Sequence, residues 1–417
     1  MRSRTSIFAV FRHREPALLI SGQAVSSFGD GVANVALTIL VLETTHSASK
    51  LGFYAAARMI PLVAFLLVGG AVVDRFSRRV LMLISDATRA LLVAGIVVLS
   101  VAGVLRYWEL ILMAVLFGAF DAIFLPAFSA LTPEIVPESL LQPMNAIRAL
   151  STNFVGGVLG PALGGLLAAW STSIALGVDA SSFVLSAAAL ILMRSTPRPK
   201  RLAGSSMLQE VRQGLQFVRR NTWIWTTLAA VAFGNALIFT PSSILMPYAL
   251  LHNLHASKAT VGVAFALGGV AGSIGTLVVG SMAAPRRRIR VMWTSWLISV
   301  AAGLILAFAT DVWEVFLVPL IMTPGMIFGN VIWESMLQRE VPRELLGRVT
   351  SVDWFVSLGL SPIGLAFAGA LVASVGIRAY LITAVIICAV PGILILLSRR
   401  ANSIDAGRAS KPAQSLE

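Results

Sequence analysis

Four ionisable side chains inside long apolar stretches are the residues of this sequence best suited to chemistry: Asp30, Arg58, Asp121 and Arg148. An ionised side chain at the centre of a bilayer costs at least about 2.5–3.5 kcal/mol, so such groups are kept where they have a partner or a task. Carboxylates bind and release protons, and guanidinium groups neutralise carboxylates. The pattern predicts a buried site for proton binding or ion pairing.

Asp30 and Arg58 are expected to lie at the same depth. At 1.5 Å per residue, Asp30 is about 18 Å from one end of its apolar stretch, and Arg58 is about 11 Å from the opposite end of the next stretch. In a hydrocarbon core of about 30 Å these positions share a level. We therefore expect the two side chains to be ion-paired or bridged by water, and protonation of Asp30 or arrival of a cation to loosen the pair. A permanent pair that only fixes helix packing is the alternative.

Other charged groups within the apolar stretches favour structural roles. The depth arithmetic places Asp121 near Arg148, which predicts a second pair that holds helices together. Asp86 and Arg89 are three residues apart, so they are expected to satisfy one another on one helix face. Asp179 is expected either to serve a gate at the outer end of its stretch or to contact another helix, and the helix contact is favoured.

Polar residues recur every three or four positions along the first apolar stretch. This spacing places them on one helix face, which must point away from lipid towards a cavity or another helix. The residues of this stripe are Gln23, Ser27, Asp30, Asn34 and Thr38.

Composition identifies the protein that carries these groups as an integral membrane protein. The chain of 417 residues is 57% hydrophobic and 12% charged, whereas soluble domains carry about 25% charged residues. A net charge of +13 on a soluble surface would point to nucleic acid, but 25 of the 32 Lys and Arg residues fall in segments that one membrane topology places on the same side. By the positive-inside rule both termini are cytoplasmic, and no nucleic-acid partner is expected.

Twelve apolar spans are predicted, beginning near residues 17, 51, 80, 110, 141, 173, 223, 259, 291, 313, 350 and 377. The longest polar segment divides them into two sets of six. The predicted organisation is a six-helix bundle over residues 1–193, a cytoplasmic linker with an amphipathic helix over 194–222, a second six-helix bundle over 223–398 and a cytoplasmic tail over 399–417. A plain spacer is the alternative for the linker.

The two halves repeat at an offset of 205 residues. Phe28, Gly29 and Asp30 correspond to residues 233–235, and residues 136–141 correspond to 341–346. Arg148 and Asp353 also occupy equivalent positions. Duplicated halves around a midplane site are a transporter architecture in which one half rocks against the other.

A short loop after the second span carries a family motif. Its residues fit the pattern GxxxDRxGRR, except that Ser77 replaces the last glycine: Gly70, Asp74, Arg75, Arg78 and Arg79. The motif resembles the loop between the second and third helices of major facilitator superfamily (MFS) transporters. That resemblance implies an all-α fold of 12 transmembrane helices in two pseudo-symmetric bundles. It also implies that Asp74 faces the start of the eleventh helix, near Thr350 and Ser351, and favours the outward-open state.

A second motif lies in the fifth span. The sequence GGVLGPALGG fits GxxxGPxxGG with Gly156, Gly160, Pro161, Gly164 and Gly165. Small residues four apart let helix backbones approach closely, and proline bends the helix, so ordinary helix packing is one interpretation. The motif also resembles the antiporter signature of MFS drug exporters. The resemblance implies export in exchange for another ion, usually protons. The arginine that such exporters often carry in the fourth span has no counterpart here, because Asp121 occupies that neighbourhood.

The second half offers candidates for a substrate cavity. Polar and aromatic residues on the seventh and tenth spans, which could equally be packing or lipid contacts, are Asn235, Phe239, Asn330, Trp333 and Glu334. An apolar cavity that contains an acid would suit lipophilic cations.

The predicted function is secondary active export of small amphipathic or lipophilic compounds from a bacterial cell membrane, with proton antiport and alternating access, as the resemblance to drug and macrolide exporters implies. Export of a siderophore, movement of a lysolipid and a membrane scaffold without transport are the alternatives. No HExxH motif and no nucleotide-binding loop occur in the sequence, which argues against an enzyme. No cofactor or metal is expected, the proton gradient supplies the energy, and a monomer is expected to suffice.

Overall fold

The computed structural model describes residues 7–66, 76–137, 140–194, 207–282 and 285–397. Its first half consists of the short 3₁₀ helix η1 (Ile7–Arg12) and eight longer helical elements. These are α1 (Arg14–Thr45), α2 (Ala48–Leu66), α4 (Arg78–Val101), α5 (Tyr107–Ile135), α6 (Leu141–Leu150) continued by the π-helical η3 (Ser151–Leu159) and by α7 (Gly160–Trp170), and α8 (Thr172–Leu192).

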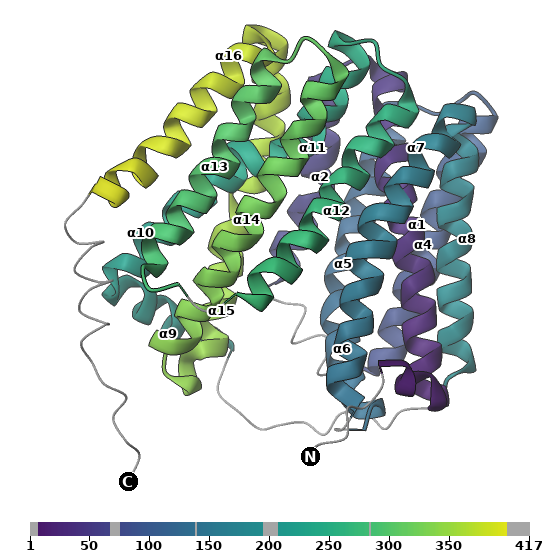
Figure 1. The fold of residues 1–417 in the computed structure, drawn as a ribbon. Coiled ribbons are helices and arrows are strands. Elements are labelled where there is room, and N and C mark those ends of the chain that lie inside the picture. The colour runs from purple at the N-terminus through teal and green to yellow at the C-terminus, as the bar shows by residue number, and fades with distance from the viewer. Residues whose placement is uncertain (1–6, 67–75, 138–139, 195–206, 283–284, 398–417) are drawn as a thin grey trace.

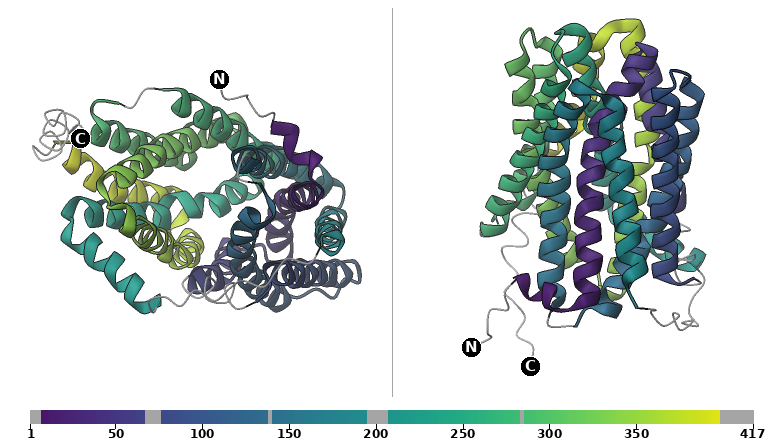
Figure 2. Two further views of the ribbon diagram at one scale, coloured as in Figure 1. Left: turned by 90° about the horizontal axis from the view of Figure 1, so that it is seen from below. Right: turned by 90° about the vertical axis from the view of Figure 1, so that its right-hand side faces the viewer.

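The linker contains helix α9 (Met207–Arg220), which contacts α15 and α10. The second half consists of α10 (Thr222–Gly234) continued by η4 (Asn235–Phe239), α11 (Thr240–Tyr248) and η5 (Ala249–Asn253), followed by α12 (Lys258–Ser281), α13 (Arg288–Phe308), α14 (Val312–Glu340), α15 (Arg343–Gly359) and α16 (Ser361–Leu397). Figure 1 shows the two halves side by side, and Figure 2 shows the same helices from one end and from the side.

The helices account for twelve membrane crossings. Ten described stretches are long and apolar enough to span a bilayer. The last of them, Leu345–Leu397, has 53 residues and contains Gly376 in a non-helical conformation (φ 82°, ψ 158°), so it makes two crossings. Only glycine adopts such a positive φ without strain, which explains why the chain reverses there. α2 packs between α5 and α16 and supplies the remaining crossing. The predicted all-α fold of twelve spans in two bundles is confirmed.

The predicted internal repeat is visible in matched helices. α5 and α14 both have 29 residues, and their first residues, Tyr107 and Val312, are 205 positions apart. Each begins with the same cap: the carboxylate of Glu109 or Glu314 accepts a hydrogen bond from the backbone N–H three residues earlier, at 2.7 and 3.0 Å. This cap satisfies a donor that has no partner within the helix. The equivalent caps show that the halves are copies of one helix pattern.

The glycine-rich motif of the fifth span brings η3 and α7 against the backbone of α1. A Cβ atom on Gly160 would lie 2.7 Å from the Cα of Gly31, and one on Gly164 would lie 2.9 Å from the Cα of Val32. Pro161 has no N–H and so donates no hydrogen bond to the preceding π-helical turn; the carbonyl of Gly157 lies in that turn. That carbonyl faces Gly269 of α12, in the other half. The motif therefore serves helix packing both within its bundle and between the bundles.

Backbone contacts between the halves run from the middle of α12, where Gly269 meets the carbonyl of Gly157, to one end of the molecule. Gly52 and Gly369 pack α2 against α16, and Gly165 and Gly262 pack α7 against α12. These positions lie near the starts of α2 and α12, which carry Lys50 and Lys258. We call this end of the molecule the lysine end. The opposite end, where α1, α4, α13 and α15 begin at Arg14, Arg78, Arg288 and Arg343, is called the arginine-rich end.

We expect Gly160→Ala to destabilise the protein, because the added methyl group meets backbone that cannot move away without separating α7 from α1. Overpacking of this kind costs about 1–3 kcal/mol. Gly177→Ala is the matched control, since a Cβ at Gly177 of α8 has nothing within 4 Å and alanine favours a helix by about 0.5–1 kcal/mol over glycine. Thermal unfolding of the purified variants in detergent should show a lower midpoint for the first variant only. Equal midpoints would contradict the packing role.

Candidate functional site

A network of ion pairs lies inside the first bundle. Arg89 of α4 donates to Asp86 on its own helix at 2.5 Å and to Asp121 of α5 at 2.8 Å, and Arg58 of α2 donates to the second oxygen of Asp121 at 3.3 Å. Ser186 of α8 donates to Asp86 at 2.7 Å. The predicted pairing of Asp86 with Arg89 is confirmed. Two acids, two arginines and the Ser186 hydroxyl thus join four helices: α2, α4, α5 and α8.

Aromatic rings surround both guanidinium groups of the network. The Arg58 group lies 4.4 Å from the centre of the Phe117 ring, and the Arg89 group lies 4.5 Å from the centres of the Phe124 and Phe183 rings. The face of an aromatic ring is negative, so it attracts a cation where water is excluded. These rings partly replace the hydration that the arginines lose in the bundle.

The ion pair expected between Asp30 and Arg58 is not the one observed, because Arg58 pairs with Asp121. The cause is the packing of α5 on α2: Gly118 has its Cα against the backbone carbonyl of Arg58, which brings Asp121, one turn later, to the guanidinium group. Asp30 is partly exposed, and no hydrogen bond or ion pair joins it to another described residue. It remains an electrostatic neighbour of Arg89, Asp121 and Arg58.

Arg148 also differs from the prediction. Its guanidinium group lies 4.7 Å from the centre of the Phe128 ring, whereas Asp121 is directed towards α2 and α4. The equal depth inferred from the sequence did not fix which helix face each residue occupies. Asn34, on the polar stripe of α1, is exposed, and its backbone carbonyl accepts a hydrogen bond from Thr38 at 2.8 Å.

Part of the loop motif lies outside the described residues, namely Gly70, Asp74 and Arg75, so the expected contact of Asp74 with Thr350 and Ser351 does too. The two remaining arginines anchor helix ends at the arginine-rich end. Arg78 contacts the carbonyl of Ala130 and the carboxylate of Glu134 on α5. Arg79 donates to carbonyls in the last turn of α8, those of Leu190 at 2.6 Å and Ile191 at 2.8 Å. The last carbonyls of a helix lack their usual helical donors, so Arg79 supplies bonds there, in addition to the one that the N–H of Met193 donates to Leu190 at 3.3 Å.

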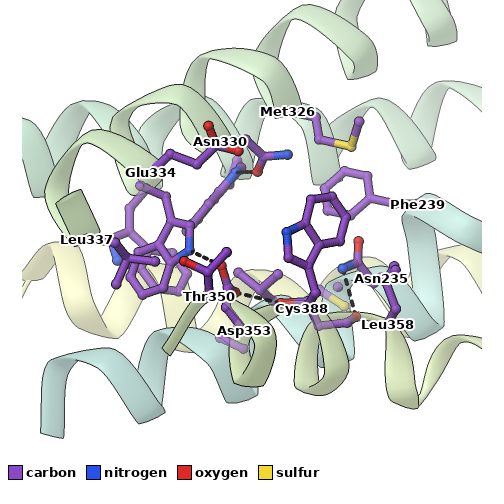
Figure 3. Close-up of a pocket in the computed structure, with 18 of the residues that line it drawn as sticks. Asn235, Phe239, Met326, Asn330, Glu334, Leu337, Thr350, Asp353, Leu358 and Cys388 are labelled. Atoms are coloured by element: carbon purple, nitrogen blue, oxygen red, sulfur yellow. Dashed lines mark hydrogen bonds between the residues drawn. The ribbon is translucent and has the colours of Figure 1, made fainter. Parts of the chain in front are cut away.

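A pocket of about 550 Å³ lies in the second bundle. Its volume is that of a site for a drug-sized ligand. All five residues proposed from the sequence line it: Asn235, Phe239, Asn330, Trp333 and Glu334. Figure 3 shows Asn330 and Glu334 on one side of the cavity and Thr350 and Asp353 facing them from α15.

Hydrogen bonds hold the polar groups of the pocket in place. The indole N–H of Trp296 donates to Asn330 at 3.1 Å, and that of Trp333 donates to Asp353 at 3.1 Å. Ser357 donates to the other oxygen of Asp353 at 3.1 Å. Because the N–H groups are engaged, the indole rings are fixed in orientation before a ligand arrives. The site is therefore largely preformed.

Several lining residues were not predicted as such from the sequence. They are Trp293 and Trp296 of α13, Trp354 and Asp353 of α15, and the single cysteine, Cys388. Two acids and four tryptophans thus face the cavity, and no Lys, Arg or His is among the described residues that line it. The internal repeat could have indicated that Asp353 lies beside Trp333. These two residues are the repeat equivalents of Arg148 and Phe128, and each of the two pairs is in contact.

Twelve apolar helices in two repeated bundles, with a buried ion-pair network in one and a ligand-sized pocket in the other, define a membrane transporter. A model of the Major Facilitator Superfamily matches residues 19–357 and 228–415. The chain belongs to the major facilitator superfamily, and it is a transporter of that class rather than an enzyme, a multi-pass protein of a bacterial membrane.

Named relatives and solved structures agree with this assignment. The chain is 29% identical to the "Multidrug efflux pump Tap" of Mycobacterium tuberculosis (strain ATCC 25618 / H37Rv) over 395 residues, 88% of this chain and 89% of that protein. It is 22% identical to the "Macrolide efflux protein A" of Streptococcus pyogenes over 366 residues, 86% of this chain and 89% of that protein.

Two solved structures share the fold. A bacterial homolog of the human lysosomal transporter Spinster, in an inward-facing and unoccupied conformation, matches with a TM-score of 0.70 at 13% identity and covers 97% of this chain and 99% of its own. The nucleoside transporter NupG matches with a TM-score of 0.68 at 12% identity over 94% of this chain and 100% of its own.

We expect Arg89→Gln to be far more destabilising than Arg58→Gln. Arg89 is 3% exposed and neutralises two acids, whereas Arg58 is 32% exposed and serves one. Removing one partner of a buried pair costs about 3–5 kcal/mol. The yield of folded protein after detergent extraction and its thermal midpoint measure the effect. Adding Asp86→Asn to Arg89→Gln should restore part of the loss, and a double variant no better than the single one would refute the charge argument.

Proposed function

We propose that the transporter exports small amphipathic or lipophilic compounds from the cytoplasm by proton antiport with alternating access. The rocking units are the two bundles, 1–193 and 223–398, and a single chain suffices. The observation that carries the proposal is the pocket of the second bundle, which has the size, the apolar walls and the fixed polar groups of a binding site. The printed names of the relatives, a multidrug efflux pump and a macrolide efflux protein, support export.

The pocket lies towards the arginine-rich end. Several of its residues are within two turns of helix ends there: Trp293 follows the start of α13, Leu346 follows the start of α15, and Glu334 and Gln338 precede the end of α14. The positive-inside rule assigns this end to the cytoplasm. Since the pocket lies towards that end, a compound would enter from the cytoplasm or from the inner leaflet, as export requires.

The chemistry of the pocket favours cationic compounds. Glu334 and Asp353 supply negative charge, and indole faces attract organic cations by about 0.5–2 kcal/mol each. The absence of basic groups among the described lining residues argues against the anionic headgroup of a lysolipid and against an anionic siderophore. Trp296 and Trp333 present flat apolar surfaces that suit many ring systems, which is consistent with a broad substrate range.

Asp30 is the proposed coupling group. It lies on α1, is partly exposed, and faces arginines that are already engaged by Asp121 and Asp86. It therefore gains or loses a proton without breaking a fixed ion pair. The charged form favours a state in which water reaches α1, and the neutral form favours a state in which the bundle closes over it. A proton bound from outside and released inside would drive one cycle of export.

Alternating access requires the lysine end to open. The contacts that must part there are the glycine pairs and the ion pair between Glu43 of α1 and Lys258 of α12. Glu43 also accepts a hydrogen bond from Thr172 at 3.2 Å. An exposed pair of this kind contributes about 0–1 kcal/mol, so it can break in each cycle.

We expect Asp30→Asn to abolish export driven by a pH gradient and to leave substrate binding unchanged. The substitution keeps the shape of the side chain and removes its titration, whereas the pocket lies in the other bundle. Ethidium efflux from proteoliposomes and quenching of tryptophan fluorescence by ethidium in detergent measure the two properties. Gln23→Ala, on the same stripe, is the control and should retain both. Persistent gradient-driven efflux in Asp30→Asn would disprove the coupling role.

We expect Glu334→Gln to weaken the binding of cations selectively. Loss of about 1 kcal/mol of charge attraction corresponds to about a fivefold rise in Kd. Tetraphenylphosphonium is a suitable cation, and uncharged triphenylphosphine oxide is its matched control, whose Kd should change less than about twofold. Calorimetry on the purified protein gives both values. Equal weakening of the two ligands would show that Glu334 shapes the pocket without selecting charge.

A further inference from the structure

A fully buried carboxyl group, that of Asp179 on α8, has no part in the ion-pair network. Asp179 is 0% exposed, and neither of its oxygens has a hydrogen-bond partner. The nearby hydroxyl of Ser182 is engaged elsewhere, since it donates to the backbone carbonyl of Asp179 at 2.8 Å. An unpaired charge at such a place costs several kcal/mol, so the group is stable there only when neutral.

The glycine next to Asp30 sets the position of this carboxyl group. A Cβ atom on Gly29 would lie 2.7 Å from Oδ1 of Asp179 and would overlap the Ser182 side chain. The carboxyl group of Asp179 therefore rests against the backbone of α1, one residue from Asp30. Asp30 and Asp179 are electrostatic neighbours. Two carboxyl groups in one low-dielectric site cannot both be charged without strong repulsion.

Counting the acidic and basic side chains inside the first bundle gives the number of protons that must be bound for its interior to be neutral. The groups that face Asp179 are Asp30 on α1, Tyr54 and Arg58 on α2, Arg89 on α4 and Asp121 on α5, with Asp86 beyond Arg89. Four carboxyl groups stand against two guanidinium groups. The two arginines are engaged by Asp86 and Asp121, so Asp30 and Asp179 are in excess. Two bound protons make the interior neutral.

We propose that Asp179 is a second proton-binding site and that Asp30 and Asp179 together carry two protons in each transport cycle. The inference rests on the proposed proton antiport. Each proton forms one O–H bond with a carboxylate oxygen and leaves to water as that bond breaks, so no other bond changes. Asp30 is partly exposed and Asp179 is buried, so the proton of Asp179 passes through Asp30. Opening of the α1–α8 contact at Gly29 releases it.

Two protons for each substrate have a thermodynamic consequence. At zero membrane potential, a gradient of one pH unit is worth about 1.4 kcal/mol per proton, or a factor of ten in concentration. Exchange with two protons sustains a substrate ratio of about 100-fold, and exchange with one proton sustains about tenfold. The limiting ratio depends on stoichiometry and not on rate, so a slow variant still reports it.

The test is the limiting ethidium ratio in proteoliposomes that hold a one-unit pH gradient, with equal potassium and valinomycin on both sides to fix the potential at zero. We expect about 100-fold for the wild-type protein and about tenfold for Asp179→Asn. Ser182→Ala, beside the carboxyl group but without a titratable group, is the matched control and should keep the wild-type ratio.

Each outcome decides the matter. A wild-type ratio near tenfold, or an unchanged ratio in Asp179→Asn, overturns the second site. Should Asp179→Asn fail to fold, the wild-type ratio alone remains decisive between one proton and two. Absence of any gradient-driven efflux by the wild-type protein would instead overturn the proposed antiport, so the two failures are distinguishable.

Discussion

The structure of the first bundle depends on one constraint: charge inside a bilayer must be neutralised. Arg89 meets this constraint at the centre, because its two ion pairs join α4 to α5 and the pairs continue to α2 through Arg58 and to α8 through Ser186. Four helices are thus held by charges that none of them can lose separately. α1 differs from these four, since the structure gives Asp30 no hydrogen bond or ion pair with any residue that it describes.

Between its two ends, where Arg14 and Glu43 make hydrogen bonds to α8 and Glu43 pairs with Lys258, α1 is instead held by close contacts at its glycines. Its glycines meet neighbouring helices directly: Gly22 and Gly29 pack on α8, and Gly31 packs on η3 and α7. Backbone contact of this kind is tight but carries no directional bond, so a small shift of α1 costs little compared with the loss of an ion pair. The helix that carries the proposed proton group is therefore the one whose attachment allows movement.

The two halves use one helix pattern for different chemistry. Phe128 and Arg148 of the first half correspond to Trp333 and Asp353 of the second, and both pairs are in contact. The position of a cation in one bundle is thus occupied by an anion in the other. The first bundle concentrates charge in an ion-pair network, whereas the second surrounds a cavity with indole rings. The proposed binding and coupling sites lie in separate halves, so a change in one need not disturb the other.

Helix geometry fixes the depth of a residue in the membrane and its neighbours on the same helix, and these are the features that the sequence can predict. Depth follows from residue counts, so the twelve spans, the repeat and the level of Asp30 and Arg58 could be predicted. Near neighbours on one helix could be predicted too, as Asp86 and Arg89 show. The partner of Arg58 could not, because it depends on which faces of α2 and α5 meet, and Gly118 decides that. The tryptophans of α13 were missed for the same reason.

The remaining question is how protonation on α1 reaches a pocket in the other bundle, and the glycine contacts give a physical route. Gly31 of α1 follows Asp30 and lies against Gly160 of α7. Five residues after Gly160, Gly165 of α7 lies against Gly262 of α12. Contacts between backbones cannot compress, since no flexible side chain lies between them, so a displacement of α1 must move α7 and then α12. α12 also bears Lys258, whose ion pair with Glu43 returns to the far end of α1. α1 is therefore linked to α12 in two ways, indirectly through the rigid backbone contacts of α7 and directly through a weak ion pair. A rigid contact that transmits motion and a weak one that yields to it are what the proposed rocking mechanism needs from the helix proposed to bind the protons.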